Sequence, residues 1–419
     1  FGGFEFDYIF VSAQRRRGEM EENMKLLMIT SRNIDKNGGE NALIIGRHTS
    51  LFKEYGIETD VIFFHKDTTK EYGSNYSGIK FISCTEENKY TKIKQLISTG
   101  QYQGIVSSGF YDNEFVKFVR LMKERYNLAY ILDIHATIKE IYEYCIPDLY
   151  HIIGTRYLYL LKRRRLIKTL KIIDYAFVVS ETEIEETNRY YKNNNIKYLL
   201  VRCGCYDTLN VEVYYKTREE YRKHLEIDND ALAFVYSGSK DRWQKFEETL
   251  KTFKMIKETG IKCKFAFYMN LSEEDKHNIN EELGKENVTI RWVAPEQMKK
   301  ELMAYDVGML LRDSNWTNKV AFPNKYSDYI ASGLHLCVSK ALTDPYKIAL
   351  NYKLKLVDLT NIEKSLEEIQ YERKNELDNY LQMCKKIIDN ELLYDIQVKN
   401  NCKSLYQCLK VIEKDSYNE

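Results

Sequence analysis

The chain carries almost no net charge, because 63 Lys and Arg residues are balanced by 62 Asp and Glu residues, for a formal charge of +1. A general nucleic-acid binder needs a surplus of positive charge, so this balance argues against one. No apolar run approaches the ~20 residues that a helix needs to cross a bilayer. A basic segment followed by a long apolar one is also missing near the start, so we expect no signal peptide and a cytoplasmic protein.

Proline and metal-binding patterns are scarce as well. The 4 prolines stand beside 34 tyrosines and many Lys, Asn and Ile residues, whose codons are rich in A and T, and this favours a bacterial source. The 9 cysteines are an odd number and most lie in apolar runs, as expected of core thiols in a reducing compartment. Cys203 and Cys205 are too close together for a common zinc pair, and no second pair follows at metal spacing, so no metal site is predicted.

The length of 419 residues predicts two or three domains. Strand-like apolar runs alternate with helical patterns within residues 24–205 and again within residues 217–394, with a polar connection at 206–216. This alternation predicts an α/β protein with two doubly wound, Rossmann-like parallel-sheet domains that face each other across a cleft. The predicted strands lie at 25–30, 61–64, 79–82, 104–107, 129–133, 175–180, 233–236, 265–268, 288–292, 307–311, 336–338 and 354–357.

Residues 1–23 are predicted to lie outside the folded core. The codons of Arg15 to Glu19 are rich in purines and resemble a ribosome-binding site upstream of Met24. We therefore expect the native protein to start at Met20 or Met24, which peptide mapping of its natural N-terminus would check.

The segment 321–333 carries the most information about function. It follows an apolar run at 306–311 that is typical of a buried parallel strand. Pro323 suits the first turn of a helix and Gly333 suits its end, so Lys325 and Asp328 fall near the helix start. Free N–H groups and the helix dipole favour an anion there, and Lys325 adds positive charge while Asp328 can accept hydrogen bonds from sugar hydroxyls. The alternative is an ordinary capped helix with a surface Lys and Asp.

The pattern Pro-Asn-Lys-x-x-Asp-Tyr-x-Ala-x-Gly at 323–333 resembles the C-domain signature of the retaining glycosyltransferases of family 4. These are two-domain enzymes of the GT-B fold that use nucleotide sugars. The resemblance implies that the N-domain holds the acceptor and the C-domain the donor. It also implies that a helix at about 395–419 crosses back onto the N-domain.

In that family two acidic residues stand eight positions apart, and the second coincides with Asp328. The resemblance implies that Asp328, where Glu is usual, holds the donor ribose. The first acidic position falls on Val320, which departs from the family pattern. We therefore expect backbone groups near Val320, Ala321 and Phe322, or another side chain, to hold the donor sugar.

Three further candidate residues lie in the N-domain. Gly38 and Gly39 belong to a loop at 31–40 that resembles the family's glycine-rich first loop, which faces donor phosphate and acceptor; a plain turn is the alternative. His135 follows a predicted strand, where the resemblance implies a catalytic-site contact with the donor sugar; a structural His is the alternative. Ser180 is predicted to cap a helix, with Glu183 completing a capping box.

The loop after the first C-domain strand holds a glycine and a group of basic residues. The family carries a glycine there and one or two basic residues that bind the donor diphosphate. Gly238 fits this pattern, beside Ser239, and the sequence leaves the basic residue open among Lys240, Arg242 and Lys245.

We prefer Arg242, acting with Lys325, as the catalytic pair of cations. Negative charge grows on the bridging oxygen as a nucleoside diphosphate leaves, and fixed cations aimed there lower the barrier. Lys245 is the reserve choice, Arg312 is a further donor-binding candidate at a strand end, and Ala294 is expected to line the base. A solvated charge cluster is the alternative for the basic residues.

A basic amphipathic stretch runs through residues 157–173. Such a helix can lie on an anionic membrane surface, as in family members that build lipid-linked glycans. The sequence therefore predicts peripheral contact with the inner face of the plasma membrane, and a solvated surface helix is the alternative.

Together these features predict a retaining, metal-independent hexosyltransferase. It would move a sugar from a nucleotide diphosphate sugar, its donor substrate, to a glycan or lipid-linked acceptor in bacterial surface polysaccharide synthesis, without a cofactor and without nucleic acid. Two alternatives stay open: a nucleotide-sugar 2-epimerase, and a non-catalytic partner subunit that kept the fold, which Val320 favours.

Overall fold

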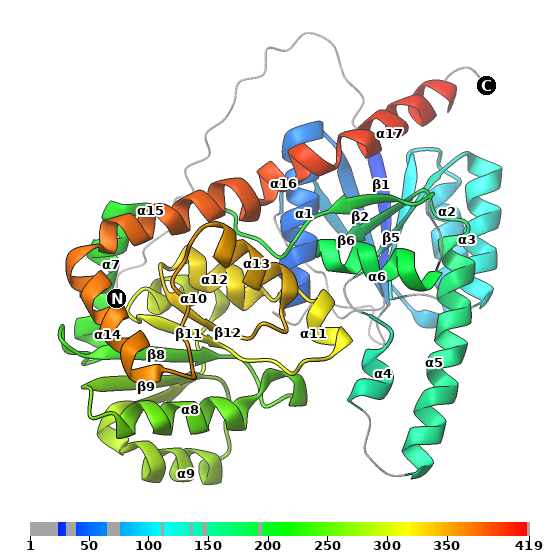
Figure 1. Ribbon diagram of the computed structural model, residues 1–419. Helices are drawn as coiled ribbons and strands as arrows, with labels where there is room; N and C mark the ends of the chain where they lie inside the picture. Colours follow the sequence, from blue (N-terminus) through cyan, green and yellow to red (C-terminus); the bar gives the residue numbers. More distant parts are fainter. Residues whose placement is uncertain are drawn as a thin grey trace, which may run out of the picture.

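The computed structural model describes residues 24–30, 39–64, 76–109, 113–134, 137–144, 149–191 and 195–416. Two separate sheets form, a 7-stranded sheet in the order β3-β2-β1-β4-β5-β6-β7 and a 5-stranded sheet in the order β10-β9-β8-β11-β12. Every strand pair within them is parallel, so each sheet is doubly wound from the strand at which its order reverses. The predicted fold class is confirmed (Figure 1).

The N-domain is built around the larger sheet, whose central strands are buried on both faces because helices cover them. Its strands are β1 (Lys25–Thr30), β2 (Glu58–Phe64), β3 (Ile79–Cys84), β4 (Gly104–Ser108), β5 (Ala129–Asp133), β6 (Tyr175–Val178) and β7 (Lys197–Leu200). Its helical segments are α1 (Gly39–Tyr55), η1 (Glu86–Asn88), α2 (Lys89–Ile97), α3 (Asn113–Tyr126), α4 (Glu140–Glu143), α5 (Leu149–Leu170) and α6 (Glu181–Tyr191).

The C-domain has the same architecture on a smaller sheet. Its strands are β8 (Leu232–Ser237), β9 (Cys263–Tyr268), β10 (Val288–Arg291), β11 (Val307–Leu310) and β12 (His335–Val338). Its helical segments are α7 (Val211–His224), η2 (Arg242–Gln244), α8 (Phe246–Glu258), α9 (Glu273–Leu283), η3 (Lys285–Asn287), α10 (Pro295–Leu302), α11 (Trp316–Val320), α12 (Asn324–Ala331), α13 (Thr343–Asn351), α14 (Ile362–Asn375), α15 (Leu377–Ile387) and η4 (Ile388–Leu392), which is a π-helix.

Three segments differ from the sequence-based expectation. The edge strand β7 was not predicted, because only Leu199 of its four residues is buried and the apolar pattern is short. The segment 354–357 forms only an isolated bridge between Leu336 and Leu356, although Leu354 and Val357 are buried. The expected connection at 206–216 overlaps the start of α7 at Val211.

The last two helices, α16 (Tyr394–Asn401) and α17 (Lys403–Ser416), lie on the N-domain (Figure 1). The Ser50 hydroxyl on α1 donates to the Asp395 carboxylate at 2.6 Å, and the Tyr175 hydroxyl donates to the Ser404 carbonyl at 2.9 Å. The chain therefore crosses twice between the domains, once before α7 and once before α16.

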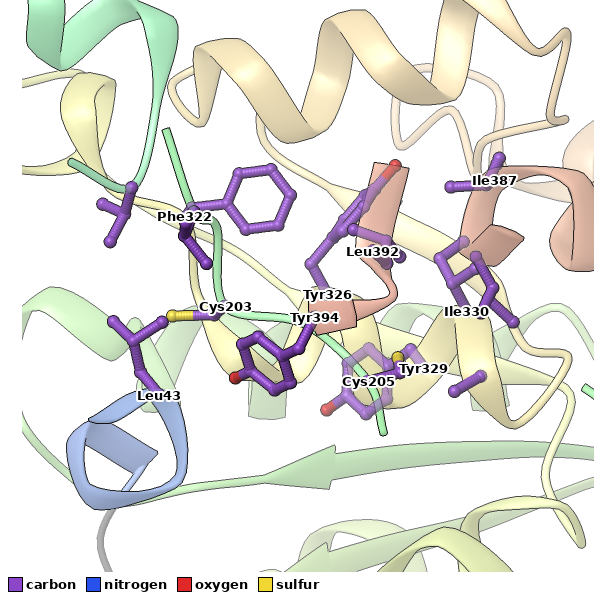
Figure 2. Close-up of a cluster of buried hydrophobic side chains, with 14 of the residues drawn as sticks. Leu43, Cys203, Cys205, Phe322, Tyr326, Tyr329, Ile330, Ile387, Leu392 and Tyr394 are labelled. Carbon is purple, nitrogen blue, oxygen red and sulfur yellow. The ribbon is translucent and has the colours of Figure 1, made fainter. Parts of the chain in front are cut away.

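These crossings meet in one apolar cluster. Figure 2 shows side chains from α1, α12 and α16 and from the 203–205 segment packed together. Gly204 is required here, because a Cβ atom would lie 2.1 Å from the Leu392 carbonyl oxygen. The Ser327 hydroxyl donates to the Cys203 carbonyl at 2.5 Å, which ties α12, the helix that carries Lys325, to the first crossing.

None of the helices in the described part of the chain is long and apolar enough to span a membrane.

Candidate functional site

Lys325 lies in the first turn of α12, at the carboxyl edge of the smaller sheet. Its ammonium group donates to the side-chain oxygen of Gln244 and lies 4.7 Å from the centre of the Tyr236 ring. A Cβ atom on Gly238 would come within 2.1 Å of that ammonium nitrogen. The glycine after β8 thus leaves the space into which the Lys325 side chain reaches.

A second cation, Arg312, follows β11 next to this group. Its backbone N–H donates to the Ser339 hydroxyl at 2.8 Å, which holds the start of the loop. Burial and the neighbouring Arg312 guanidinium lower the pKa of Lys325 well below its usual value, and burial lowers the pKa of Arg312. Within the described residues, no carboxylate forms an ion pair with either side chain. Asp241 and Asp328 act on Lys325 only over a distance, so an anion can still bind directly beside these two basic groups.

The helix start adds hydrogen-bond donors to the same place. Asn324 and Lys325 are the first two residues of α12, so their N–H groups have no intrahelical acceptor. Pro323 precedes them in an extended conformation, with φ −69° and ψ 139°. Amide donors, helix dipole and two cations therefore converge, and this set can bind a phosphate or diphosphate group.

Asp328 lies one turn farther along α12. The residue is exposed, yet the protein around its carboxyl removes enough water to raise the pKa to about 6, against the opposing effect of Lys299 and Lys325. No described residue forms a hydrogen bond or ion pair with the carboxyl, so it can accept hydrogen bonds from ligand hydroxyls.

The N-domain meets this edge of the C-domain directly. The Tyr144 hydroxyl accepts hydrogen bonds from the side chains of Asn315 at 2.7 Å and Asn318 at 2.8 Å. The Ser180 hydroxyl, which also caps α6 as predicted, donates to the Val320 carbonyl at 2.6 Å. The anion-binding group therefore lies where the two domains touch.

Two other predicted cations, Arg242 and Lys245, have contacts of their own. Arg242 is exposed in η2 and donates to the Tyr144 carbonyl at 3.3 Å, across the domain boundary. Lys245 has a left-handed backbone with φ 53° and forms ion pairs with Glu248 at 2.6 Å and Asp313 at 2.8 Å. Arg312 is the guanidinium that lowers the pKa of Lys325, and the catalytic role of Arg242 stays a prediction.

The remaining C-domain candidates surround the same loops. The Ser239 hydroxyl accepts a hydrogen bond from the Gln244 side chain at 2.6 Å. Ala294 is the N-cap of α10. Val320 is buried, its carbonyl accepts a hydrogen bond, and the Ala321 N–H donates to the Asn318 carbonyl at 3.3 Å. The expected contact of this backbone with the donor sugar stays a prediction.

Two N-domain candidates lie outside the described residues, namely Gly38 and His135. Gly39 is the first residue of α1, at the carboxyl edge of the larger sheet. Their roles remain those implied by the sequence.

Sequence reasoning missed several residues of the site: Tyr236, Gln244, Tyr144 and Glu143. The predicted strand at 233–236 ends at Tyr236, so the position of this residue at the sheet edge was available as a signal. The other three act through contacts between distant segments, and no local pattern marks them.

No group of three or more His, Cys, Asp or Glu residues within the described ranges could hold a metal ion.

No protein-family model matches the chain, and no curated protein matches it in sequence. Solved structures do match. A glycosyltransferase from Rickettsia africae ESF-5 has a TM-score of 0.62 at 11% identity, covering 93% of this chain and 99% of that one. Anabaena Alr3699/HepE in complex with UDP has a TM-score of 0.63 at 10% identity, covering 92% and 100%.

WaaG, a glycosyltransferase involved in lipopolysaccharide biosynthesis, has a TM-score of 0.59 at 10% identity, covering 90% of this chain and 98% of that one. Similarity at this level of identity shows the fold. The chain has the two-domain GT-B architecture.

Proposed function

We propose that this protein is a glycosyltransferase that binds a nucleotide diphosphate sugar between its two domains. The observation that carries the proposal is the pair of cations without a carboxylate partner, Lys325 and Arg312, beside the N-terminus of α12. That group suits a diphosphate, and Asp328 is one helical turn away, where a ribose hydroxyl can reach it. UDP in complex with the structural neighbour HepE supports this choice of ligand class.

In this proposal the cations have two roles. Lys325 and Arg312 neutralise the diphosphate on binding, and they stabilise the negative charge that grows on the bridging oxygen as the bond to the sugar breaks. Burial and the Arg312 charge lower the pKa of Lys325, and a bound anion would raise this pKa back toward its usual value. Contact between the domains keeps water away from the donor.

The finer parts of the proposal concern the reaction outcome. Retention of configuration, a hexose donor and an acceptor from surface polysaccharide synthesis rest on the signature at 323–333. Catalysis without a metal suits a site in which cations and amides supply the positive charge. The product's anomeric configuration, determined by NMR, would test retention.

We include peripheral membrane contact through α5 in the proposal. Ile153, Tyr157 and Leu160 are exposed on it, with side chains 51% to 65% accessible, and Arg164 and Lys168 are exposed farther along. Figure 1 shows the helix extending away from the larger sheet. Sedimentation with vesicles should show binding to anionic but not to zwitterionic lipid.

The test of the donor site is calorimetric titration with UDP and a panel of nucleoside diphosphates. Lys325→Ala should weaken binding of the preferred nucleotide by about 100-fold, because a charge-assisted contact in a partly buried site is lost. Lys364→Ala is the matched control, since that ammonium group is exposed on α14 and its side chain is 68% accessible. Unchanged affinity in Lys325→Ala would contradict the assignment.

Val320 supports a second candidate function. Its side chain is apolar and buried, so no carboxylate stands at the first acidic position of the signature. A partner subunit that binds nucleotide sugar without transferring it would have this feature. Slow release of free sugar from the bound donor separates the two, because an enzyme hydrolyses its donor and an inert subunit does not.

A further inference from the structure

The short helix α11 is held by the other domain at both of its ends. At its start the Glu143 carboxylate accepts hydrogen bonds from the N–H groups of Trp316 at 3.0 Å and Thr317 at 2.9 Å, and from the Thr317 hydroxyl at 2.6 Å. At its end the Val320 carbonyl accepts from the Ser180 hydroxyl at 2.6 Å. Glu143 and Ser180 belong to the N-domain, whereas α11 belongs to the C-domain.

These contacts bear on the anion-binding group because of where α11 lies in the chain. It lies between Arg312 and Lys325, so the segment that presents both cations passes through it. A helix of 5 residues has little stability of its own and depends on its contacts. Glu143 forms hydrogen bonds with neither cation, but it holds the helix that lies between them in the chain.

Tyr144 extends the same contact to the neighbouring loop. Its hydroxyl accepts from the Asn315 and Asn318 side chains, and its carbonyl accepts from Arg242 of η2. Its ring packs edge-on against Trp243, with centroids 5.7 Å apart. The end of α4 thus contacts both C-domain loops that lie beside the anion-binding group.

The C-domain in turn supplies a carboxylate that caps a helix of the N-domain. Asp344, on α13 of the C-domain, accepts hydrogen bonds from the N–H groups of Glu181 at 2.7 Å and Thr182 at 3.2 Å, at the start of α6. The Thr182 hydroxyl donates to the same carboxylate at 2.5 Å. Each domain therefore supplies a carboxylate that caps a helix of the other, and separation of the domains would leave each helix start with only its own cap, Ser180 on α6 and Asn315 on α11.

We propose that α11 couples the approach of the two domains to the assembly of the donor site, and that Glu143 is a positioning residue acting through α11. The inference rests on the proposed function, because the site it assembles is the one assigned to the donor diphosphate. By linkage, a nucleoside diphosphate that binds the assembled site favours the arrangement in which the domains touch.

Hydrogen exchange of the full chain without ligand tests the first half of this proposal. In Glu143→Ala, peptides that cover residues 316–320 should exchange faster than in the wild type, because two amides lose their acceptor. Asn210→Ala is the matched control: it removes a side-chain cap from the Val213 amide of α7 within the C-domain and should leave α11 unchanged. Wild-type exchange of α11 in Glu143→Ala would overturn the proposal.

Calorimetric titration with UDP tests the second half. Glu143→Ala should weaken UDP binding by about fivefold or more. The affinity of Glu143→Gln, which keeps one acceptor oxygen, should lie between those of the wild type and Glu143→Ala. The Asn210→Ala control should bind as tightly as the wild type. If the wild type binds UDP and Glu143→Ala binds it equally well, the coupling is wrong while the donor site stands. If the wild type binds no nucleoside diphosphate, the proposed function fails, and the coupling to a donor fails with it.

Discussion

The position of the Lys325 ammonium group depends on its own helix and also on residues from a distant part of the chain. Its position in the first turn of α12 follows from local sequence, because Pro323 and Gly333 mark the helix limits. Its neighbours Tyr236, Gln244 and Gly238 come from a loop more than 80 residues earlier, as the 81-residue separation from Gln244 indicates. Their convergence is a property of the folded sheet.

Gly238→Ala should reduce affinity for UDP by about tenfold, which corresponds to about 1.4 kcal/mol. The new methyl group would lie 2.1 Å from the Lys325 ammonium nitrogen and displace it from its present place. Calorimetry measures the effect, and circular dichroism checks that the fold is kept. Gly154→Ala on α5 is a suitable control, because a Cβ atom there meets nothing within 4 Å. Affinity equal to that of the wild type would show that the space beside Gly238 is not needed.

The carboxyl of Asp328 predicts how binding depends on pH. Its pKa of about 6 means that the carboxylate, which accepts hydrogen bonds from ribose hydroxyls, is lost as the pH falls through 6. Affinity for a UDP-sugar, whose diester phosphates keep their charge in this range, should therefore decline between pH 7 and about 5. In Asp328→Asn the affinity should be lower and nearly independent of pH over the same interval. A wild-type affinity that is constant from pH 5 to 7 would contradict the role of this carboxyl.

At the scale of an element, α12 and α11 differ in how well the sequence predicts them. The limits of α12 follow from proline, glycine and apolar spacing, all of which are local. The 5 residues of α11 carry no comparable pattern, and its start is capped by Asn315 from its own chain segment and by Glu143 from the other domain. Short helices stabilised by distant side chains cannot be read from a local window.

The buried carboxyl of Glu183 on α6 should make the stability of the protein depend on pH. Burial raises the pKa of this carboxyl from 4.5 to about 8, although the Val179 N–H donates to it at 3.0 Å. The folded state thus keeps its proton to higher pH than the unfolded chain, so the free energy of unfolding should fall as the pH rises from 4.5 to about 8.

The loss expected from this group is a few kcal/mol over that interval. In Glu183→Gln this pH-dependent contribution to stability should vanish. Urea unfolding of the wild type and the variant at pH 5, 7 and 9 measures it as the difference between their free energies of unfolding. Parallel changes with pH in both proteins would show that Glu183 does not titrate in this way.

At the scale of the whole molecule, the two domains are joined by packing as well as by the chain. Tyr394 is buried, and its ring lies against Gly46 of α1, where a Cβ atom would come within 2.3 Å of it. The Tyr394 N–H donates to the Cys205 carbonyl at 3.1 Å, which ties α16 to the first crossing (Figure 2).

Tyr394→Ala should therefore destabilise the protein by about 3–5 kcal/mol, because a large buried ring is replaced by a cavity. The domains should also unfold less cooperatively, seen as two transitions in calorimetry where the wild type has one. Tyr394→Phe keeps the ring and serves as the control. A Tyr394→Ala variant that unfolds in one transition at the wild-type temperature would show that this contact does not join the domains.

The sequence by itself determined the α/β class, the two parallel sheets, most strand positions and the helix that presents Lys325 and Asp328. These features follow from apolar periodicity and from proline and glycine at helix limits, which act over a few residues. Only the tertiary structure decided that Arg312 lies beside Lys325, that Arg242 contacts the N-domain, and that Glu143 and Asp344 cap helices across the domain boundary. Those contacts join segments up to 174 residues apart, and their geometry depends on how the two domains pack.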